Sequence, residues 1–327
     1  MKRRAATRYL LTACVIALPP LLGVSGAFAQ TPYPNKPIRL VVPFPAGDPP
    51  DIYARALADR LSPILGQPIV IDNKPGAAGG IGAAEIAKAP NDGYHLLYAS
   101  AASLTITPQL RKVTYDPVKD FEPVGSAVSG IMAVTVNKGF PGNTWPEFVA
   151  EVKRNPGKYS VISSGDGSFL HLAAMHLQSV MGLELLHVPY KSLGQGVIDQ
   201  VAGTANVSLE MSASLPHVRA GTVKALLVMD DKPSPELPGT PNLKDMQVPF
   251  NLKPWFGVMA PAGTPPAVLA RLQAAMAQVV PTDPQYASRL PPGTYPLYLG
   301  GRDFNALIES DRKAYGAVIT KLNLKLD

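Results

Sequence analysis

The stretch Ile38-Arg-Leu-Val-Val-Pro-Phe-Pro-Ala-Gly-Asp-Pro-Pro-Asp-Ile-Tyr-Ala-Arg-Ala-Leu57 decides the fold of this chain. Its apolar run over residues 38–44 predicts a strand that is covered on both faces. A turn containing proline and glycine follows, and the next residues predict a helix with one apolar stripe: Tyr53, Leu57, Leu61 and Leu65. A strand that turns directly into a helix aims backbone N–H groups at whatever lies above the turn. The stretch therefore predicts an α/β fold with a small-anion site made from main chain.

The alternation of strands and helices continues along the chain. Strands are predicted at 69–72, 95–100, 131–137, 159–164, 185–190, 207–211, 223–229 and 255–260, and helices at 81–89, 171–181, 194–202 and 303–322. A capping box at Thr144–Glu147 opens a further helix, and Thr264 is expected to cap the helix that carries Val268 and Val279. The β-α-β-α-β order at the start implies a parallel sheet with helices on both faces. Two such sets, joined by a chain that crosses over and later returns, would place strand ends on both sides of one cleft.

The first 29 residues have the pattern of an export signal. Four basic residues precede a long apolar run over residues 10–26, and Ala27-Phe28-Ala29 fits the small-x-small cleavage pattern, so Gln30 is expected to start the mature chain. A membrane anchor is the alternative interpretation, but the prolines and glycines of the run and the cleavage pattern argue against it. On an exported protein, the turn after residue 44 favours a receptor for a small solute over an enzyme.

Composition narrows the function classes further. Cys14 is the single cysteine and lies in the signal, so the mature chain of about 298 residues has no disulfide, thiolate nucleophile or cysteine metal ligand. Four of the 30 Lys and Arg residues also lie there, which leaves 26 basic residues against 24 acidic ones. No basic block occurs, so nucleic acid is not an expected partner. The 46% of apolar residues can supply the core of two lobes.

Seven segments in order carry a resemblance to a known family. Two of them are Pro90-Asn-Asp-Gly-Tyr94 and His187-Val-Pro-Tyr-Lys191, and the others lie at 33–47, 72–82, 115–121, 215–221 and 255–264. From residue 33 to about residue 318 the chain resembles the substrate-binding proteins of tripartite tricarboxylate transporters, the Bug family. The resemblance implies a two-lobed periplasmic binding protein, a Venus flytrap with hinged α/β lobes. Residues 30–133 and 256–327 would form lobe 1, and residues 134–255 would form lobe 2.

The resemblance also implies a function. Family ligands are typically carboxylates, held by loop N–H groups, hydroxyls and ordered water, with no metal or cofactor. The loaded protein, expected to be a monomer, would deliver its solute to membrane transporter subunits or, in some members, to a sensor. A dicarboxylate, an aromatic carboxylate, an amino acid-like solute and an amide all remain open as the ligand.

The candidate ligand contacts fall in four segments, each of which follows a predicted strand, and at one acidic residue. They are Pro45, Ala46, Gly47, Asp48 and Asp51 in the first turn; Ser100, Ala101 and Ser103; Ser163, Ser164, Gly165, Gly167, Ser168 and His171; Tyr190 and Lys191; and Glu210. Small and hydroxyl residues let a ligand approach the backbone and exchange hydrogen bonds with it. Lys191 is a counter-ion for a carboxylate or an exposed lysine, and His171 is more often a packed helix residue than a proton carrier.

The first turn departs from the family pattern, which usually has two glycines here. Asp48 replaces the second glycine, and Pro49 and Pro50 carry no N–H group. The same residues also predict a helix start, with Asp48 as N-cap and Asp51 at the third helical position. Asp48 and Glu210 together would suit a ligand with a donor group, such as an ammonium or hydroxyl, besides any carboxylate. The glycine-rich segment 72–82 lacks a phosphate-loop pattern and is interpreted as backbone geometry and a helix entry.

A secreted serine hydrolase is the alternative function. It would use Ser164 or Ser168 with His171, because catalytic triads are defined by geometry and not by sequence position. The chain has no G-x-S-x-G elbow and no H-E-x-x-H motif. The sequence therefore favours a receptor without catalytic residues.

Overall fold

The computed structural model describes residues 33–326. The predicted signal, with its cleavage site at Ala29, lies outside the described residues. Between residues 33 and 326, no helix combines the length and the apolar character that crossing a membrane requires.

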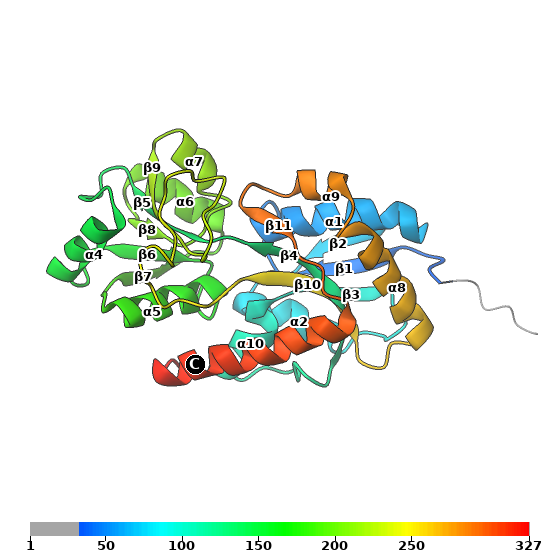
Figure 1. Cartoon of the computed structure of the whole chain (residues 1–327). Coiled ribbons are helices and arrows are strands. Elements are labelled where there is room, and N and C mark those ends of the chain that lie inside the picture. The colour runs from blue at the N-terminus through cyan, green and yellow to red at the C-terminus, as the bar shows by residue number, and fades with distance from the viewer. Residues whose placement is uncertain (1–32, 327) are drawn as a thin grey trace, which may run out of the picture. The chain divides into compact units, whose positions relative to one another are not determined.

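The first sheet contains six strands in the order β11-β4-β10-β3-β1-β2 (Figure 1). In chain order these are β1 (Ile38–Val42), β2 (Ile69–Asn73), β3 (His95–Ser100), β4 (Phe121–Gly130), β10 (Trp255–Pro261) and β11 (Thr294–Pro296). β1 pairs in parallel with β2 and β3, as the β-α-β-α-β order predicts, and the connections contain α1 (Pro49–Leu65) and α2 (Gly80–Ile86). The apolar stripe of α1 is buried at Tyr53, Leu57, Leu61 and Leu65. β10 pairs antiparallel with both β3 and β4.

The second sheet contains five strands in the order β7-β6-β8-β5-β9. They are β5 (Ala133–Asn137), β6 (Ser160–Ser163), β7 (Leu186–Pro189), β8 (Val207–Ser208) and β9 (Val223–Val228), and their helices are α4 (Trp145–Arg154), α5 (Phe169–Met181), α6 (Leu193–Ala202) and α7 (Leu215–Arg219). β6 is parallel to both β7 and β8. Ala133 and Trp255, at the boundaries expected from the sequence, are strand residues of the second and the first sheet respectively.

The C-terminal helix contacts segments that belong to both sheets. α10 (Gly301–Lys321) packs on β4 and on the short η2 (Ala102–Ile106), and its Tyr315 ring meets Phe169 of α5 edge-on with centroids 6.0 Å apart. One cluster of buried side chains accordingly includes members of both sheets. The remaining helical segments are η1 (Ala77–Gly79), α3 (Thr107–Leu110), α8 (Pro266–Val279) and α9 (Pro284–Arg289).

Two local expectations need correction. Thr264 does not cap α8: the N-cap is Pro265, and the Thr264 hydroxyl donates to the Pro261 carbonyl instead. In the predicted capping box, Thr144 accepts from the Glu147 N–H, but the Glu147 carboxylate reaches one residue further back, to the Asn143 N–H. The ten-residue β4 was not predicted, because glycine, proline and serine interrupt its apolar pattern.

Gly257 lets β10 lie between its neighbours. A Cβ atom here would lie 2.7 Å from the Gly125 carbonyl oxygen and closer still to the Phe304 ring. We expect Gly257→Ala to lower the free energy of unfolding by about 1–3 kcal/mol, because neither the strand backbone nor the buried ring can move aside cheaply. In the control Gly139→Ala, the new Cβ meets only the Asn137 amide, at 3.4 Å. The free energy of unfolding of this variant should stay within about 0.5 kcal/mol of the wild-type value. Equal urea midpoints for the two variants would contradict this account.

Candidate ligand-binding site

A cavity of about 580 Å³ lies where loops from both sheets meet. Its lining residues at 43–53, 75–79 and 100–102 follow β1, β2 and β3, and those at 164–170, 190–193 and 210–212 follow β6, β7 and β8. Parallel strands end at a common edge of their sheet, and open α/β sheets bind ligands at that edge. The cavity is therefore the candidate site.

Ten of the predicted contact residues line this cavity. They are Pro45, Asp48, Ser100, Ala101, Ser164, Gly165, Ser168, Tyr190, Lys191 and Glu210. Seven others lie in the same segments but outside the lining: Ala46, Gly47, Asp51, Ser103, Ser163, Gly167 and His171. These seven could act on a ligand only by positioning the residues that line the cavity.

Asp51 fixes the first turn. Its carboxylate accepts from the Gly47 N–H, from Arg55 Nε and from Asn73 Nδ2, each at 2.9 Å. Burial opposes the charged form, but the Arg55 hydrogen bond, helped by Gly47 and Asn73, holds the pKa of Asp51 below its ordinary value. A carboxylate with these partners holds the turn in shape and has little capacity left for a solute.

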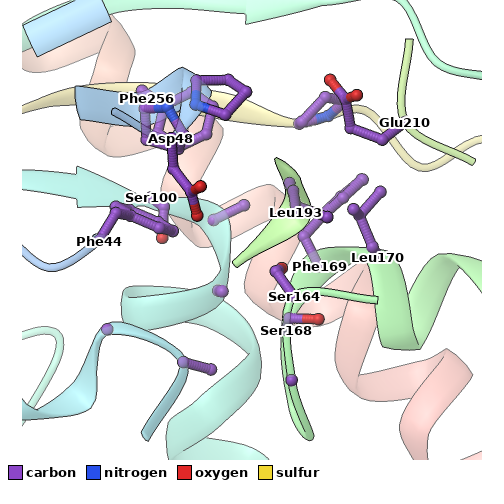
Figure 2. A pocket seen from close by; sticks show the side chains of 18 of the residues that line it. Phe44, Asp48, Ser100, Ser164, Ser168, Phe169, Leu170, Leu193, Glu210 and Phe256 are labelled. Carbon is purple, nitrogen blue, oxygen red and sulfur yellow. The ribbon is translucent and has the colours of Figure 1, made fainter. Parts of the chain in front are cut away.

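Asp48 occupies the N-cap position of α1, as predicted, but its side chain makes no capping bond. Its carboxylate points into the cavity (Figure 2) and accepts from the Ser192 hydroxyl at 2.6 Å and from the N–H groups of Leu193 and Gly194. Burial raises the pKa of Asp48, although these hydrogen bonds oppose the shift. Asp48 thus joins the turn after β1 to the N-terminus of α6, across the cavity.

A second link crosses the cavity at Glu210. The Tyr53 hydroxyl of α1 donates to Ser212 Oγ at 3.2 Å, and Ser212 in turn bonds to the Glu210 carboxylate. That carboxylate also accepts the N–H groups of Ser212 and Ala213, each at 2.7 Å. Burial raises the pKa of Glu210 against these hydrogen bonds. Glu210 is therefore, like Asp48, hydrogen-bonded within the protein, and Asp166 is the third acidic residue of the lining.

The loop after β6 presents small residues to the cavity. Gly165 and Gly167 have φ of 103° and 77°, which side chains with a Cβ rarely adopt. Ser168 caps α5 by accepting the His171 N–H at 3.1 Å, and its hydroxyl proton is still available to a ligand. Ser164 and Ser168 lie together at one end of the view in Figure 2. On the first sheet, Ser100 and the buried Ser103 bond to each other and shape the backbone after β3.

A stacked pair of histidines supports this loop from behind. The rings of His171 and His187 lie 3.9 Å apart and within 5° of parallel. His171 Nδ1 accepts the Gly167 N–H at 3.1 Å, and His187 Nε2 lies 2.7 Å from Ser163 Oγ. Burial, and then the neighbouring His187, lower the pKa of His171 to about 4, while burial also lowers the pKa of His187 against the pull of Asp166. Both rings are therefore neutral at pH 7.

This cluster bears on the hydrolase alternative and on whether a metal ion could bind here. Ser163, His187 and Asp166 have the order of a catalytic triad, with His187 Nδ1 3.6 Å from Asp166 Oδ1. However, Ser163 is fully buried and lies outside the cavity lining, so its hydroxyl cannot reach a solute there. Asp166, His171 and His187 offer metal-ligand atoms within 4.8 Å of one another. Parallel rings direct their lone pairs side by side, whereas a zinc ion needs them to converge at about 2.0–2.1 Å.

Sequence reasoning missed a large part of the cavity wall. Segment 75–79, interpreted from the sequence as backbone geometry and a helix entry, lines the cavity, as does Arg111. Apolar side chains make up much of the remaining lining: Phe44, Tyr53, Ile131, Met132, Phe169, Leu170, Leu193, Met211, Trp255 and Phe256. In the sequence most of these residues cannot be told from core residues. Phe169 is the exception, because it follows the small-residue loop 163–168 and its ring could stack on an aromatic ligand.

The fold and the cavity define the class of this protein. Two α/β sheets that share one cavity at their strand ends form the architecture of a periplasmic binding protein. A family model described as "Tripartite tricarboxylate transporter family receptor" matches residues 53–324. The chain belongs to this family, which confirms the resemblance seen in the sequence, the two-lobed α/β fold class and the role as a solute receptor.

Individual relatives agree with this assignment. The chain is 29% identical to BugT of Bordetella pertussis over 311 residues, which cover 93% of this chain and 94% of that protein. It is similar to the solved periplasmic binding protein BugD, with a TM-score of 0.82, 31% identity and coverage of 90% of this chain and 99% of that one. It is also similar to R. palustris Rpa4515 with adipate, with a TM-score of 0.84, 28% identity and coverage of 90% and 99%. MatC from Rhodopseudomonas palustris with bound malate gives a TM-score of 0.80 at 26% identity, with coverage of 88% and 100%.

The buried His171 should make stability fall in acid. Unfolded histidine titrates near pH 6.5, and folded His171 near pH 4, so between these values only the unfolded chain binds the extra proton. Stability is lost as pH falls through this window. His171→Asn can still accept the Gly167 N–H, because its Oδ1 takes the place of Nδ1, but it does not titrate, so we expect its urea midpoint to fall less between pH 7 and pH 4.5 than that of the wild type. An equal fall in both proteins would contradict the assignment.

Proposed function

We propose that this exported receptor binds a small organic carboxylate in the cavity between its two sheets and delivers it to the membrane subunits of a tripartite tricarboxylate transporter. The observation that carries the proposal is the convergence of six strand-end segments, from two sheets, on one cavity with hydroxyl groups and basic side chains in its lining. Family membership and the adipate- and malate-bound neighbours support a carboxylate. Use of the same protein as the receptor of a sensor would need the same site.

The binding motion we infer is closure of two lobes about the connections near residues 131–132 and 254. The lobes would be 30–133 with 256–327, and 134–255, although the strands change sheet one residue earlier at each boundary, at Ala133 and at Trp255. The first lobe would hold the solute by segments 45–51 and 100–103, and the second by 163–168, Tyr190 and Lys191. A solute shifts the open–closed equilibrium only by its greater affinity for the closed form. The mature receptor would start at Gln30, act as a periplasmic monomer, and release its solute unchanged.

Ligand-dependent thermal stabilisation tests this function. An organic-acid library should contain a solute that raises the melting temperature with a concentration dependence that follows RT ln(1 + [L]/Kd), and mass spectrometry should recover that solute intact. Turnover of an ester panel would instead support the hydrolase.

Ser164→Ala should weaken binding of that solute by roughly 10- to 100-fold, because one hydrogen bond to a charged group is lost, while the melting temperature of the unliganded protein stays unchanged. The matched control is Ser288→Ala on the exposed face of α9, where the hydroxyl donates only to the Gln285 carbonyl. Unchanged affinity in Ser164→Ala would remove the loop after β6 from the site.

A further inference from the structure

The donors at the N-terminus of α6 are already used by the protein itself. Asp48, only 6% exposed, accepts from the Ser192 hydroxyl and from the Leu193 and Gly194 N–H groups. A helix N-terminus favours an anion because its first N–H groups have no partner within the helix. Here the anion is a side chain from the other side of the cavity. A solute carboxylate that approached α6 would have to displace Asp48 or share its donors.

The N-terminus of α1 offers no substitute site. Pro49 and Pro50 occupy its first two positions and both line the cavity, but neither has an N–H group. Asp48 lies beside them and adds negative charge to this wall, and Glu210 adds a second acidic group. A second carboxylate on the solute would meet the like charge of Asp48 here, although the basic Lys191, which precedes Ser192, also lines the cavity.

Donors remain at the other end. Ser164 and Ser168 line the cavity near Arg111, whose Nη2 lies 3.4 Å from the Asp166 carbonyl. Arg111 Nε is buried and has no hydrogen-bond partner among the described residues. In Figure 2 the carboxylates of Asp48 and Glu210 lie above Ser164 and Ser168. Donors without a partner in the described part of the chain therefore remain beside Ser164 and Ser168, where Asp166 is the acidic lining residue, whereas the donors of α6 are bonded to Asp48.

The walls between these ends are apolar. Phe44 and Phe256 from the first sheet face Phe169, Leu170 and Leu193 from the second. Burial of an apolar body against such side chains stabilises the complex in proportion to the area removed from water. A solute with one carboxylate and a hydrocarbon or aromatic body would satisfy both the walls and the donor end.

We propose that Asp48 is a specificity-determining residue: its carboxylate fills the second anion position of the cavity, so the receptor selects monocarboxylates with an apolar body and rejects dicarboxylates. This inference rests on the proposed function, because it concerns the ligand of the same cavity. Rejection by an unmatched like charge is a common basis of selectivity between similar ligands.

Matched pairs of acids test this selectivity by calorimetry. Hexanoate and adipate share a six-carbon chain, and benzoate and terephthalate share a ring, so each pair differs by one carboxylate. The wild type should bind at least one of the two monocarboxylates. Its affinity for that acid should be at least 10-fold higher than its affinity for the dicarboxylate of the same pair. Asp48→Gly should reduce that ratio at least 10-fold by raising the affinity for the dicarboxylate, since glycine is tolerated at an N-cap and frees the donors of α6.

Two further variants make the result decisive. Asp48→Asn keeps an acceptor for the Ser192 hydroxyl without the charge. It should therefore lower the ratio of monocarboxylate affinity to dicarboxylate affinity even if Asp48→Gly is too unstable to measure. Asp59→Asn is the control, because this exposed carboxylate pairs with Arg289 away from the cavity lining, and it should leave the ratio unchanged.

A wild type that binds the dicarboxylates as tightly as their partners, or a ratio that does not change in either Asp48 variant, would overturn the selectivity and leave the proposed function standing. If no carboxylate bound, neither in these pairs nor in the wider library, both the selectivity and the proposed function would be overturned.

Discussion

Parallel pairing within each sheet is the constraint on which the binding site depends. β1 pairs in parallel with β2 and β3, and β6 pairs in parallel with β7 and β8. The three strands of each set therefore end at a common edge of their sheet, and the segments that follow them begin there. Both edges face one cavity. Small residues, positive-φ glycines and helix N-termini occur in these segments because a ligand must approach the backbone there. The strands that pair antiparallel, β10 and β5 among them, complete the sheets and contribute less to the site.

Two acidic groups of the cavity are hydrogen-bonded to the protein itself. Asp48 and Glu210 accept from donors that follow strands of the second sheet, and Asp51, outside the lining, accepts from Arg55 and Asn73. A buried carboxylate without such partners would be costly, so these bonds decide which acidic groups the cavity can contain. They also decide what a solute can use, because a donor that is already bonded to the protein is available only at the cost of breaking that bond.

The loop after β6 depends on groups that no solute touches. His171 and His187 stack behind it and bond to Gly167 and Ser163, and Ser168 closes the N-terminus of α5. The loop backbone is therefore held in one conformation before a ligand arrives, which reduces the entropy that binding must overcome. In this way the buried neutral histidines act as structural groups of the site.

The sequence by itself determined most of the elements and their order, but not β4. Apolar runs located β1 and β3, and the stripe of α1 appeared as predicted, because strand and helix periodicity are local properties. Ordered motif segments identified the family. The tertiary structure alone decided what the site residues do. Asp48 and Ser192 are 144 positions apart, and Arg111 and the aromatic wall carry no mark of their role in the chain. A hydrogen bond or a cavity wall between distant residues depends on the packing of whole elements, which no local pattern encodes.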